Sequence, residues 1–447
     1  MLSEIEIQDF KSYKKATLSL APLSLLIGAN ASGKSNAIEA LRILSWISQG
    51  QKLNSIKYGV SDSEDIVRGR LSDLGRDGNS VFTLLCRVAT TEWNSLLIEL
   101  ECRENELHIS QEQVSSPKSS FPLYRIKEAS KGDRTDIAVE YNNFARGGKK
   151  PVIACIDQMA IFTQLETPAR FGSSHKKAQI EIPKTVALYQ KLLSNILFLD
   201  PVPSLMREDA NRHEKKLRGD GKNLSGVLYT LCQNKEQKSI VLDLIRSLPE
   251  QDITDITFLE GRRGDVMVAL VESFGGKTKS WDATLLSDGT LRVLAIAAAL
   301  LSAPEGSLVV VEEVDNGIHP SRARQLLQSM RELAEKRQLC LLLTTHNPAL
   351  MDALPDEAIK DVIFCYRNPE NGYSELKKLS TLVDYPSLVA QGSLGHLVTN
   401  GVVERYAKSS CTPEQKKEKA LAWLLELEQG EECVYSVVSS SRDKVIS

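Results

Sequence analysis

Near its start, the chain shows a pattern of apolar and polar residues that predicts short strands followed by a helix. Segments 2–7 and 16–20 have the alternation of short strands, and 23–27 is a continuous apolar run typical of a buried strand. From 36 to 47, apolar residues recur at helical spacing. The glycine-containing segment 28–35 is therefore expected to be a loop that leads from a buried strand into a helix.

The pattern changes several times farther along the chain. Alternation with period two over 80–112 predicts antiparallel strands. Polar phrases between 113 and 150 indicate exposed loops, and 155–250 is mostly helical in pattern. Strands and helices alternate over 251–365. No internal repeat or long heptad array is present, so a long coiled coil is not expected.

The last segment, 366–447, is expected to be a helical tail. Its most regular part is a charged helix expected over 414–429. Glu426 and Glu428 of this helix, together with Glu431 and Glu432, are expected on a solvated face and not in a second catalytic centre.

Composition and charge narrow the class of protein. A chain of 447 residues with 42% hydrophobic and 25% charged residues suggests two or three globular domains. The formal net charge of -3 gives no global reason to expect nucleic acid. The sequence has no apolar run long enough to span a membrane and no signal-peptide pattern, and its eight scattered cysteines lack metal-binding spacing. We therefore expect a cytoplasmic protein without a membrane partner.

The loop predicted at 28–35 carries the clearest chemical motif. Its sequence, GANASGKS, fits the GxxxxGK[ST] pattern, whose backbone N–H groups cradle the phosphates of ATP at the start of a helix. Lys34 is expected to reach the β- and γ-phosphates, and the Ser35 hydroxyl is expected to bind Mg²⁺. The expected nucleotide-binding residues are Gly28, Asn30, Ala31, Ser32, Gly33, Lys34, Ser35 and Asn36.

Two further elements supply acids and a histidine. The buried strand expected over 307–311 ends in Glu312 and Glu313, and parallel strands present such residues at the sheet edge where ligands bind. We expect Glu312 to hold Mg²⁺ and Glu313 to polarise the attacking water. His346 follows the next apolar strand and is expected to contact the γ-phosphate.

A fourth element, LSDG, precedes a long apolar helical run. Ser287 and Gly289 are placed at the N-terminus of this helix, where free N–H groups bind anions. A serine N-cap with Asp288 in the first turn has the same pattern, and both roles are compatible.

In the order phosphate loop, LSDG, Glu-Glu strand and histidine, the chain resembles the ABC-type ATPase heads of the RecF/SMC branch. It is more similar still to stand-alone bacterial RecF-like ATPases, which resemble OLD-type enzymes and ATPase subunits of anti-phage defence systems. The supporting phrases are FKSY (10–13), DGKNLSGVLYTL (220–231), VEEVDNGIHP (311–320) and GSLGHLVTNG (392–401).

The resemblance implies an α/β fold: a P-loop NTPase head of the ABC type with an antiparallel β lobe and an inserted helical subdomain. The head would be assembled from an N-terminal half, 1–112, and a C-terminal half, 251–365. The loop-rich and helical insertion is expected at 113–250, and the tail at 366–447.

The resemblance also implies a head-to-tail homodimer with two ATP molecules in its interface. Ser287 and Gly289 of one copy would then cap the ATP on the phosphate loop of the other, and Asp315 and Asn316 would lie in the D-loop region. Gln158 is the candidate for the Q-loop glutamine near Mg²⁺. The chain departs from the family pattern in two places, with Glu312 in place of the usual aspartate and LSDGT in place of LSGGQ.

Three functions remain open from the sequence. The first is a slow ATPase switch that dimerises, or forms a higher homo-oligomer, and gates a separate effector protein of an anti-phage defence module. The second is a RecF-like DNA-binding repair ATPase, suggested by basic segments at 146–150, 176–177 and 215–216. The third is a nucleotide-dependent scaffold with little turnover. A transporter ATPase fits least, and no nuclease domain is expected because OLD-type TOPRIM domains need a longer C-terminal segment.

Overall fold

The computed structural model describes residues 1–408 apart from 62–63, 91, 133, 247–251, 317–319 and 383. The chain divides into two compact units, Met1–Ser380 and Thr381–Ser447. The helix expected over 414–429 lies outside the described residues. None of the helices in the described ranges is long and apolar enough to cross a membrane.

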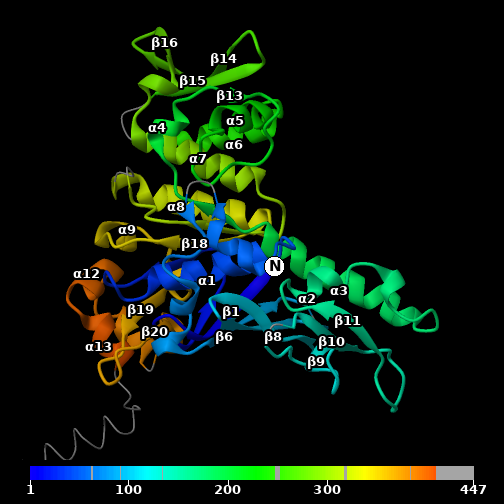
Figure 1. Ribbon diagram of the computed structural model, residues 1–447. Coiled ribbons are helices and arrows are strands. Elements are labelled where there is room, and N and C mark those ends of the chain that lie inside the picture. Colours follow the sequence, from blue (N-terminus) through cyan, green and yellow to red (C-terminus); the bar gives the residue numbers. More distant parts are fainter. Residues whose placement is uncertain are drawn as a thin grey trace, which may run out of the picture. The chain divides into compact units, whose positions relative to one another are not determined.

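The first unit is built on one large mixed sheet (Figure 1). Across the described residues its strands lie in the order β11-β10-β9-β8-β7-β6-β1-β2-β20-β19-β3-β18-β17-β12. The parallel part contains β3 (Ser24–Ile27), β12 (Leu197–Leu199), β17 (Leu308–Val311), β18 (Cys340–Thr344) and β19 (Ile363–Arg367).

The other strands of the sheet form its antiparallel part. They include the N-terminal hairpin β1–β2 and the strands β6 to β11, of which β11 forms the edge of the sheet. Strand β20 pairs with β2 and with β19, and it thus joins this part to the parallel part. These strands are β1 (Leu2–Phe10), β2 (Tyr13–Ser19), β6 (Val81–Val88), β7 (Ser95–Arg103), β8 (Glu106–Ser115), β9 (Tyr124–Glu128), β10 (Asp136–Tyr141), β11 (Val152–Ile156) and β20 (Ser374–Lys378).

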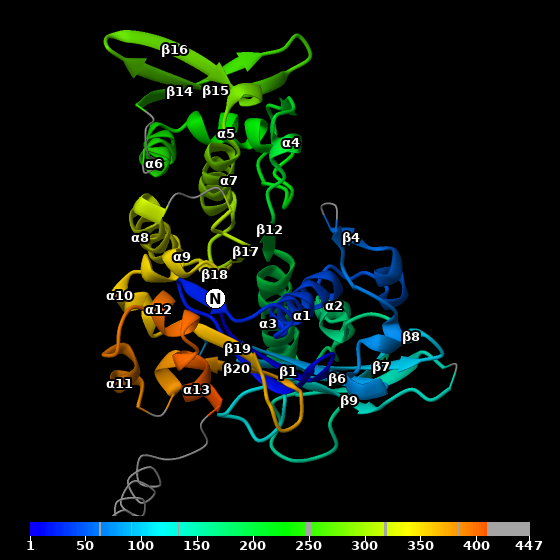
Figure 2. The same ribbon diagram turned by 90° about the vertical axis from the view of Figure 1, so that its left-hand side faces the viewer.

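A smaller layer is formed by a second sheet and helices. Figures 1 and 2 show β14 to β16 lying over α5 and α6, with α7 leading back toward the large sheet. Its elements are α4 (Pro203–Met206), β13 (Ala210–Asn211), α5 (Leu224–Cys232), α6 (Lys235–Ile245), β14 (Ile253–Glu260), β15 (Asp265–Phe274), β16 (Lys277–Asp282) and α7 (Asp288–Ser302).

The remaining elements are mostly short. In the first unit they are α1 (Lys34–Ile47), β4 (Val60–Ser61), β5 (Glu64–Asp65), α2 (Ile161–Gln164), α3 (Lys176–Ser194), α8 (Pro320–Lys336), α9 (Pro348–Asp352) and α10 (Asp356–Ile359). The second unit contains α11 (Tyr385–Val389), α12 (Leu394–Thr399) and α13 (Val402–Lys408).

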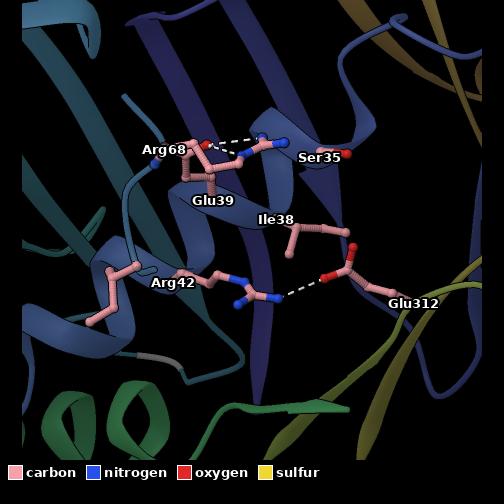
Figure 3. Close-up of a pocket in the computed structure, with 7 residues that line it drawn as sticks. Ser35, Ile38, Glu39, Arg42, Arg68 and Glu312 are labelled. Atoms are coloured by element: carbon pink, nitrogen blue, oxygen red, sulfur yellow. Dashed lines mark hydrogen bonds and ion pairs between the residues drawn. The ribbon is translucent and has the colours of Figure 1, made fainter. Parts of the chain in front are cut away.

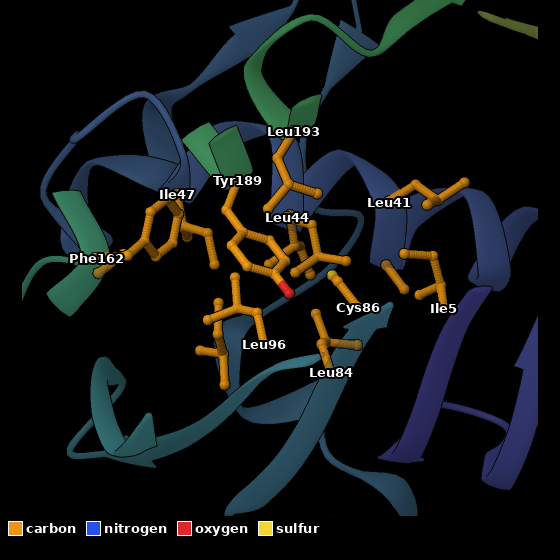
Figure 4. Close-up of a cluster of buried hydrophobic side chains, with 14 of the residues drawn as sticks. Ile5, Leu41, Leu44, Ile47, Leu84, Cys86, Leu96, Phe162, Tyr189 and Leu193 are labelled. Carbon is orange, nitrogen blue, oxygen red and sulfur yellow. The ribbon is translucent and has the colours of Figure 1, made fainter. Parts of the chain in front are cut away.

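The main core fixes helix α1, which follows the phosphate loop, onto the antiparallel strands. Figure 4 shows the ring of Tyr189 from α3 between Leu44 of α1 and Leu84 and Leu96 of β6 and β7. The Tyr189 hydroxyl donates to the carbonyl of Trp93 over 2.9 Å, so this buried polar group is satisfied. The phosphate loop is thereby attached to a helix that cannot move independently of the sheet.

The strands and layers of the structure cross three of the boundaries expected from the sequence. The antiparallel part continues through β9, β10 and β11 into the segment expected to be loops, because short strands there are separated by long polar turns. The border at 250 divides the smaller layer, since β14 and β15 pack on α5 and α6. The border at 365 cuts through β19, whose partner β20 belongs to the large sheet.

One buried carboxyl group links the antiparallel strands to the segment after them. Glu112 on β8 accepts hydrogen bonds from the Tyr124 hydroxyl and from the backbone N–H groups of Ile161 and Phe162, at 2.6, 2.7 and 2.7 Å. Burial raises the pKa of Glu112 from 4.5 to about 7, although these three donors favour the charged form.

The raised pKa of Glu112 predicts a pH-dependent contribution to stability. Between pH 4.5 and about 7 the folded chain keeps a proton that the unfolded chain releases, so this contribution is lost as pH rises, by roughly 3 kcal/mol in all. Urea unfolding of the native chain and Glu112→Gln at pH 5, 6 and 7.5 measures it. We expect the advantage of the native chain over the variant to shrink with pH, and a constant difference would contradict the assignment.

Candidate nucleotide site

The phosphate loop connects β3 to α1 and is held in a conformation that requires glycine at two positions. Gly28 and Gly33 have φ of 152° and 122°. A Cβ at Gly28 would lie 2.2 Å from the carbonyl oxygen of Cys365, and a Cβ at Gly33 would lie 2.4 Å from the Ser374 hydroxyl oxygen. The loop is therefore packed directly against the β19–β20 hairpin.

Side chains from both ends of the chain hold the loop through contacts with its carbonyl groups. The Tyr13 hydroxyl donates to the carbonyl of Gly33 over 3.0 Å, and the Ser374 hydroxyl donates to the carbonyl of Ser32 over 2.5 Å. The Cys365 thiol lies 3.4 Å from the same Ser32 carbonyl, and burial raises its pKa. These contacts hold the loop without using the N–H groups that a phosphate would bind.

Lys34 bends back over the loop that precedes it. Its ammonium group donates to the carbonyls of Gly28 and Ala29, at 2.6 and 3.0 Å. Partial burial lowers the pKa of Lys34. A phosphate group would give this ammonium stronger, charge-assisted bonds than the two carbonyls do.

The expected acids follow the buried strand β17 at the edge of the sheet next to the loop. Glu312 pairs with Arg42 of α1 over 2.8 Å, as Figure 3 shows, and Arg42 also lies 5.1 Å from the ring centroid of Phe198 on β12. The side chain of Arg42 is 9% exposed and that of Glu312 is 25% exposed. The carboxylate is thus positioned from the same helix that begins at the phosphate loop.

Glu313 is held in a strained backbone conformation. Its φ is 47°, in the left-handed region that is unfavourable for a residue with a Cβ. The Glu313 N–H donates to the Thr344 hydroxyl over 2.9 Å, and the Asn316 amide donates to the Glu313 carboxylate over 2.9 Å. Bonds with Thr344 at the end of β18 and with Asn316 therefore orient this residue.

A cavity of about 410 Å³ brings the predicted residues together. The loop from Ala29 to Asn36 lines it, together with Glu312, Glu313 and His346. Thr345, next to His346, donates to the Asp315 carboxylate over 2.6 Å and links the end of β18 to the segment after Glu313. Ser35 and Glu312 both offer oxygen atoms, the donors that Mg²⁺ prefers.

Two arginines that sequence patterns did not reveal also line this cavity. Arg68 bonds to the buried Glu39 of α1, shown in Figure 3, and Arg367 donates to the Ala31 carbonyl over 3.1 Å. Each lies in a segment without clear periodicity, so only the fold shows that it reaches the loop.

Two sets of predicted residues do not reach this cavity within the chain. Ser287 caps α7, where its hydroxyl accepts from the Thr290 N–H over 3.1 Å, and neither Ser287 nor Gly289 lines the cavity. Gln158, the candidate Q-loop residue, does not line the cavity either. Its side chain accepts from the Asn54 amide over 2.8 Å and lies 3.5 Å from the His108 ring, on the antiparallel strands.

Comparisons with known proteins agree with this geometry. A family model described as "AAA ATPase domain" matches residues 1–239, more than half of the 447 residues. The chain belongs to this AAA ATPase family. A second model, described as "AAA domain, putative AbiEii toxin, Type IV TA system", matches residues 179–352.

Two known proteins are similar in sequence to this AAA ATPase. An "ATP/GTP phosphatase" of Helicobacter pylori is 20% identical over 380 residues, covering 82% of this chain and 90% of the relative. "DNA replication and repair protein RecF" of Cutibacterium acnes is 27% identical over 139 residues, covering 30% of this chain and 31% of RecF. The RecF/SMC-like ABC-type ATPase expected from the sequence is confirmed.

Solved structures with similar folds include two SMC heads. The "SMC head domain from Thermotoga maritima" has a TM-score of 0.37 at 12% identity, over 84% of this chain and 98% of that chain. The "SmcHead bound to the C-winged helix domain of ScpA" has a TM-score of 0.44 at 12% identity, over 84% and 96%.

The Arg42–Glu312 pair of this ATPase predicts a measurable stability effect. Arg42→Met leaves the Glu312 carboxylate without this ion pair, and we expect a loss of about 1–3 kcal/mol of unfolding free energy because the group is mostly shielded from water. Arg42→Lys is the conservative control, and the double variant Arg42→Met with Glu312→Gln should recover much of the loss. Urea unfolding measures all three, and an unchanged midpoint for Arg42→Met would contradict the pairing.

Proposed function

We propose that this ATPase is a switch that closes head to tail with a second copy around two ATP molecules. One observation supports the catalytic part: the phosphate loop, Glu312, Glu313 and His346 surround one cavity at the edge of the parallel strands. A pair of acids and a histidine beside a phosphate loop is the set of groups that ATP hydrolysis needs. ATP is the proposed substrate.

Each residue has a role in the proposed reaction. The loop N–H groups and Lys34 bind the β- and γ-phosphates, and Lys34 exchanges its two carbonyl partners for phosphate oxygens. Ser35 and Glu312 would hold Mg²⁺, which neutralises charge on the phosphates when bound. Glu313, oriented by Asn316, accepts a hydrogen bond from the attacking water, and His346 contacts the γ-phosphate.

The proposed closure follows from the placement of the LSDG element. Ser287 and Gly289 stand at the start of α7, a helix of 15 residues, yet they do not line the cavity of their own chain. Helix N-termini bind phosphate oxygens. A second copy, arranged head to tail, supplies this element to the ATP on the first and completes both sites at once.

We further propose that the closed dimer gates a separate effector of a defence module. Support comes from the match of residues 179–352 to the model whose description names a putative AbiEii toxin. The Helicobacter pylori relative, by contrast, is called a phosphatase, and its alignment over 90% of its length supports hydrolysis itself. Slow turnover suits a switch, because the closed state then lasts long enough to act on the effector.

Mixing two inactive variants tests the shared site. Lys34→Ala has a defective phosphate loop, and Ser287→Arg has a defective LSDG element, so each alone should release phosphate at least about a hundredfold more slowly. In an equal mixture we expect up to roughly a quarter of the native rate, because half the dimers are mixed and each contains one intact site.

The outcome of this mixing distinguishes a shared site from a site within one chain. If Ser287 acted on the ATP of its own chain, no mixture would contain an intact site and the rate would stay at the level of the separate variants.

A second measurement uses Glu313→Gln with Mg·ATP in gel filtration. Elution at the same volume with and without ATP would count against closure.

A second candidate function is DNA binding, which one arrangement of charges favours. The fold brings together two of the three basic segments. Lys150 lies 5.2 Å from the ring centroid of Phe121, and Lys177 lies 4.5 Å from that of Phe144. We call the following residues the basic surface: Lys118, Arg146, Lys149, Lys150, Lys176 and Lys177.

The basic surface has little compensating negative charge. No ion pair involving these six residues is recorded within the described part of the chain. In 141–181 the acidic residues are Asp157, which is fully buried, Glu166, and Glu181, which lies one helical turn from Lys177. Cations that are not paired with carboxylates attract a phosphate backbone. Lys215 and Lys216 lie in the segment before α5 and belong to a different part of the fold.

Salt-dependent binding to a short fluorescent DNA duplex tests this candidate. We expect Lys149→Glu with Lys177→Glu to weaken binding at low salt by about tenfold or more and to reduce the slope of log K against log salt by about two. The matched control is Lys215→Glu with Lys216→Glu, which changes net charge equally. No binding at low salt, or an equal loss in the control, would exclude the basic surface as a DNA site.

A further inference from the structure

Across the described residues, strand β11 forms one edge of the large sheet. Its sequence, VIACI, contains no charged residue and no proline and is rich in β-branched residues, which favours pairing with any further strand. Proteins usually shorten or cover such an edge, because it presents a row of backbone N–H and C=O groups. Strand β12, at the other end of the strand order, has three residues, whereas β11 has five. The edge at β11 is therefore expected to be covered.

The register of β11 on β10 decides which of its backbone groups point away from the sheet. The Asp157 N–H, just after β11, donates to the Thr135 carbonyl, just before β10, over 2.9 Å. The direction of the backbone groups alternates along a strand, so the odd-numbered residues of this segment face β10. The even-numbered residues face outward, and they are Val152, Ala154 and Ile156.

The side chain of Gln164 covers one end of this outward row. The Ile156 N–H donates to Gln164 Oε1 over 3.0 Å, and Gln164 Nε2 donates to the Ile156 carbonyl over 2.7 Å. Nε2 also donates to the Met159 carbonyl over 3.0 Å. The amide thus makes with Ile156 the same pair of bonds that a residue of a neighbouring strand would make.

The guanidinium of Arg170 covers the next outward group. It donates to the Ala154 carbonyl and, through Nη1, to the backbone carbonyl of Gln164 over 2.7 Å. Nη2 also lies 3.7 Å from the Cys155 thiol. Hydrogen bonds from a charged donor are stronger than those between neutral groups. Arg170 thereby ties Gln164 to the strand that both side chains cover, and we call Gln164 and Arg170 the edge cover.

The buried carboxyl group of Glu112 holds the helix that carries Gln164. Gln164 is the last residue of α2, which lies beside β11 (Figure 1). The N–H groups of Ile161 and Phe162, the first two residues of α2, both donate to Glu112 over 2.7 Å. Since a helix of four residues is not stable by itself, these bonds fix α2 and thus the edge cover on the antiparallel strands.

We infer that β11 is a strand-pairing surface that the edge cover keeps closed, and that the partner it fits is β11 of a second copy of the chain. In an antiparallel pair with a twofold axis at Ala154, the outward groups of Val152, Ala154 and Ile156 meet those of the other copy. The edge cover occupies both groups of Ile156 and the carbonyl of Ala154, so this pair cannot form. The inference is independent of the proposed closure around ATP, which uses the LSDG element.

Sedimentation velocity of the full chain without nucleotide tests the inference, because closure around ATP does not contribute there. We expect Gln164→Ala with Arg170→Ala to self-associate at least about tenfold more tightly than the native chain, since the uncovered backbone groups gain partners. The matched control is Gln179→Ala with Arg146→Ala, which removes the same residue types outside the edge. Gln179 donates to the carbonyls of Phe171 and Gly172, each over 3.3 Å. This control should sediment as the native chain does.

A proline on the edge separates strand pairing from other causes of association. Ala154→Pro removes an outward N–H that β10 does not use, and proline is tolerated on edge strands. Added to Gln164→Ala with Arg170→Ala, it should return the association to the native level. Association that persists with the proline comes from another surface or from misfolding, and it would overturn the inference. Unchanged association of the double variant, or equal association of the control, would overturn it as well.

Hydrogen exchange followed by mass spectrometry gives a second measurement on dilute protein. We expect the Ile156 N–H to exchange at least about tenfold faster in Gln164→Ala than in the native chain, because its acceptor is removed. The Asp157 N–H, which bonds to Thr135, should keep its native rate. An unchanged rate at Ile156 would show that Gln164 does not cover the edge in solution.

Discussion

The close packing of the phosphate loop on the β19–β20 hairpin is the constraint on which the site depends. At Gly28 and Gly33 there is no room for a Cβ, because the Cys365 carbonyl and the Ser374 hydroxyl occupy that space. Residues more than 300 positions apart in the chain thus fix one loop. Because these contacts use carbonyl groups of the loop, they leave its N–H groups available for phosphate.

The same arrangement places the acids. Strands β3, β18 and β17 are parallel neighbours, so the residues after them meet at one edge of the sheet. Glu312 is held there by Arg42 from α1, and Glu313 by bonds to Thr344 and Asn316. Positioned charges of this kind need little rearrangement during a reaction, which is the main physical source of catalysis in phosphoryl transfer.

Much of the fold and of the site could be predicted from local patterns. The loop motif, the apolar strand before Glu312 and the strand before His346 each have a strong local signature, and the structure brings these residues to one cavity. The strands β9 to β11 were missed because polar turns interrupt them, and β20 was missed because only its pairing with β19 identifies it. Gln158 contacts Asn54 and does not line the cavity, and this could not be foreseen because a single glutamine has no local signal of its role.

By itself, the sequence determined the chemistry of the phosphate loop and of the acids, because their function depends on residue types at fixed short spacing. Only the tertiary structure decided which distant residues join them. Arg42, Arg68 and Arg367 reach the site through contacts between segments that no spacing rule connects. Ser287 is kept outside the cavity of its own chain for the same reason, since its helix belongs to a different layer of the fold.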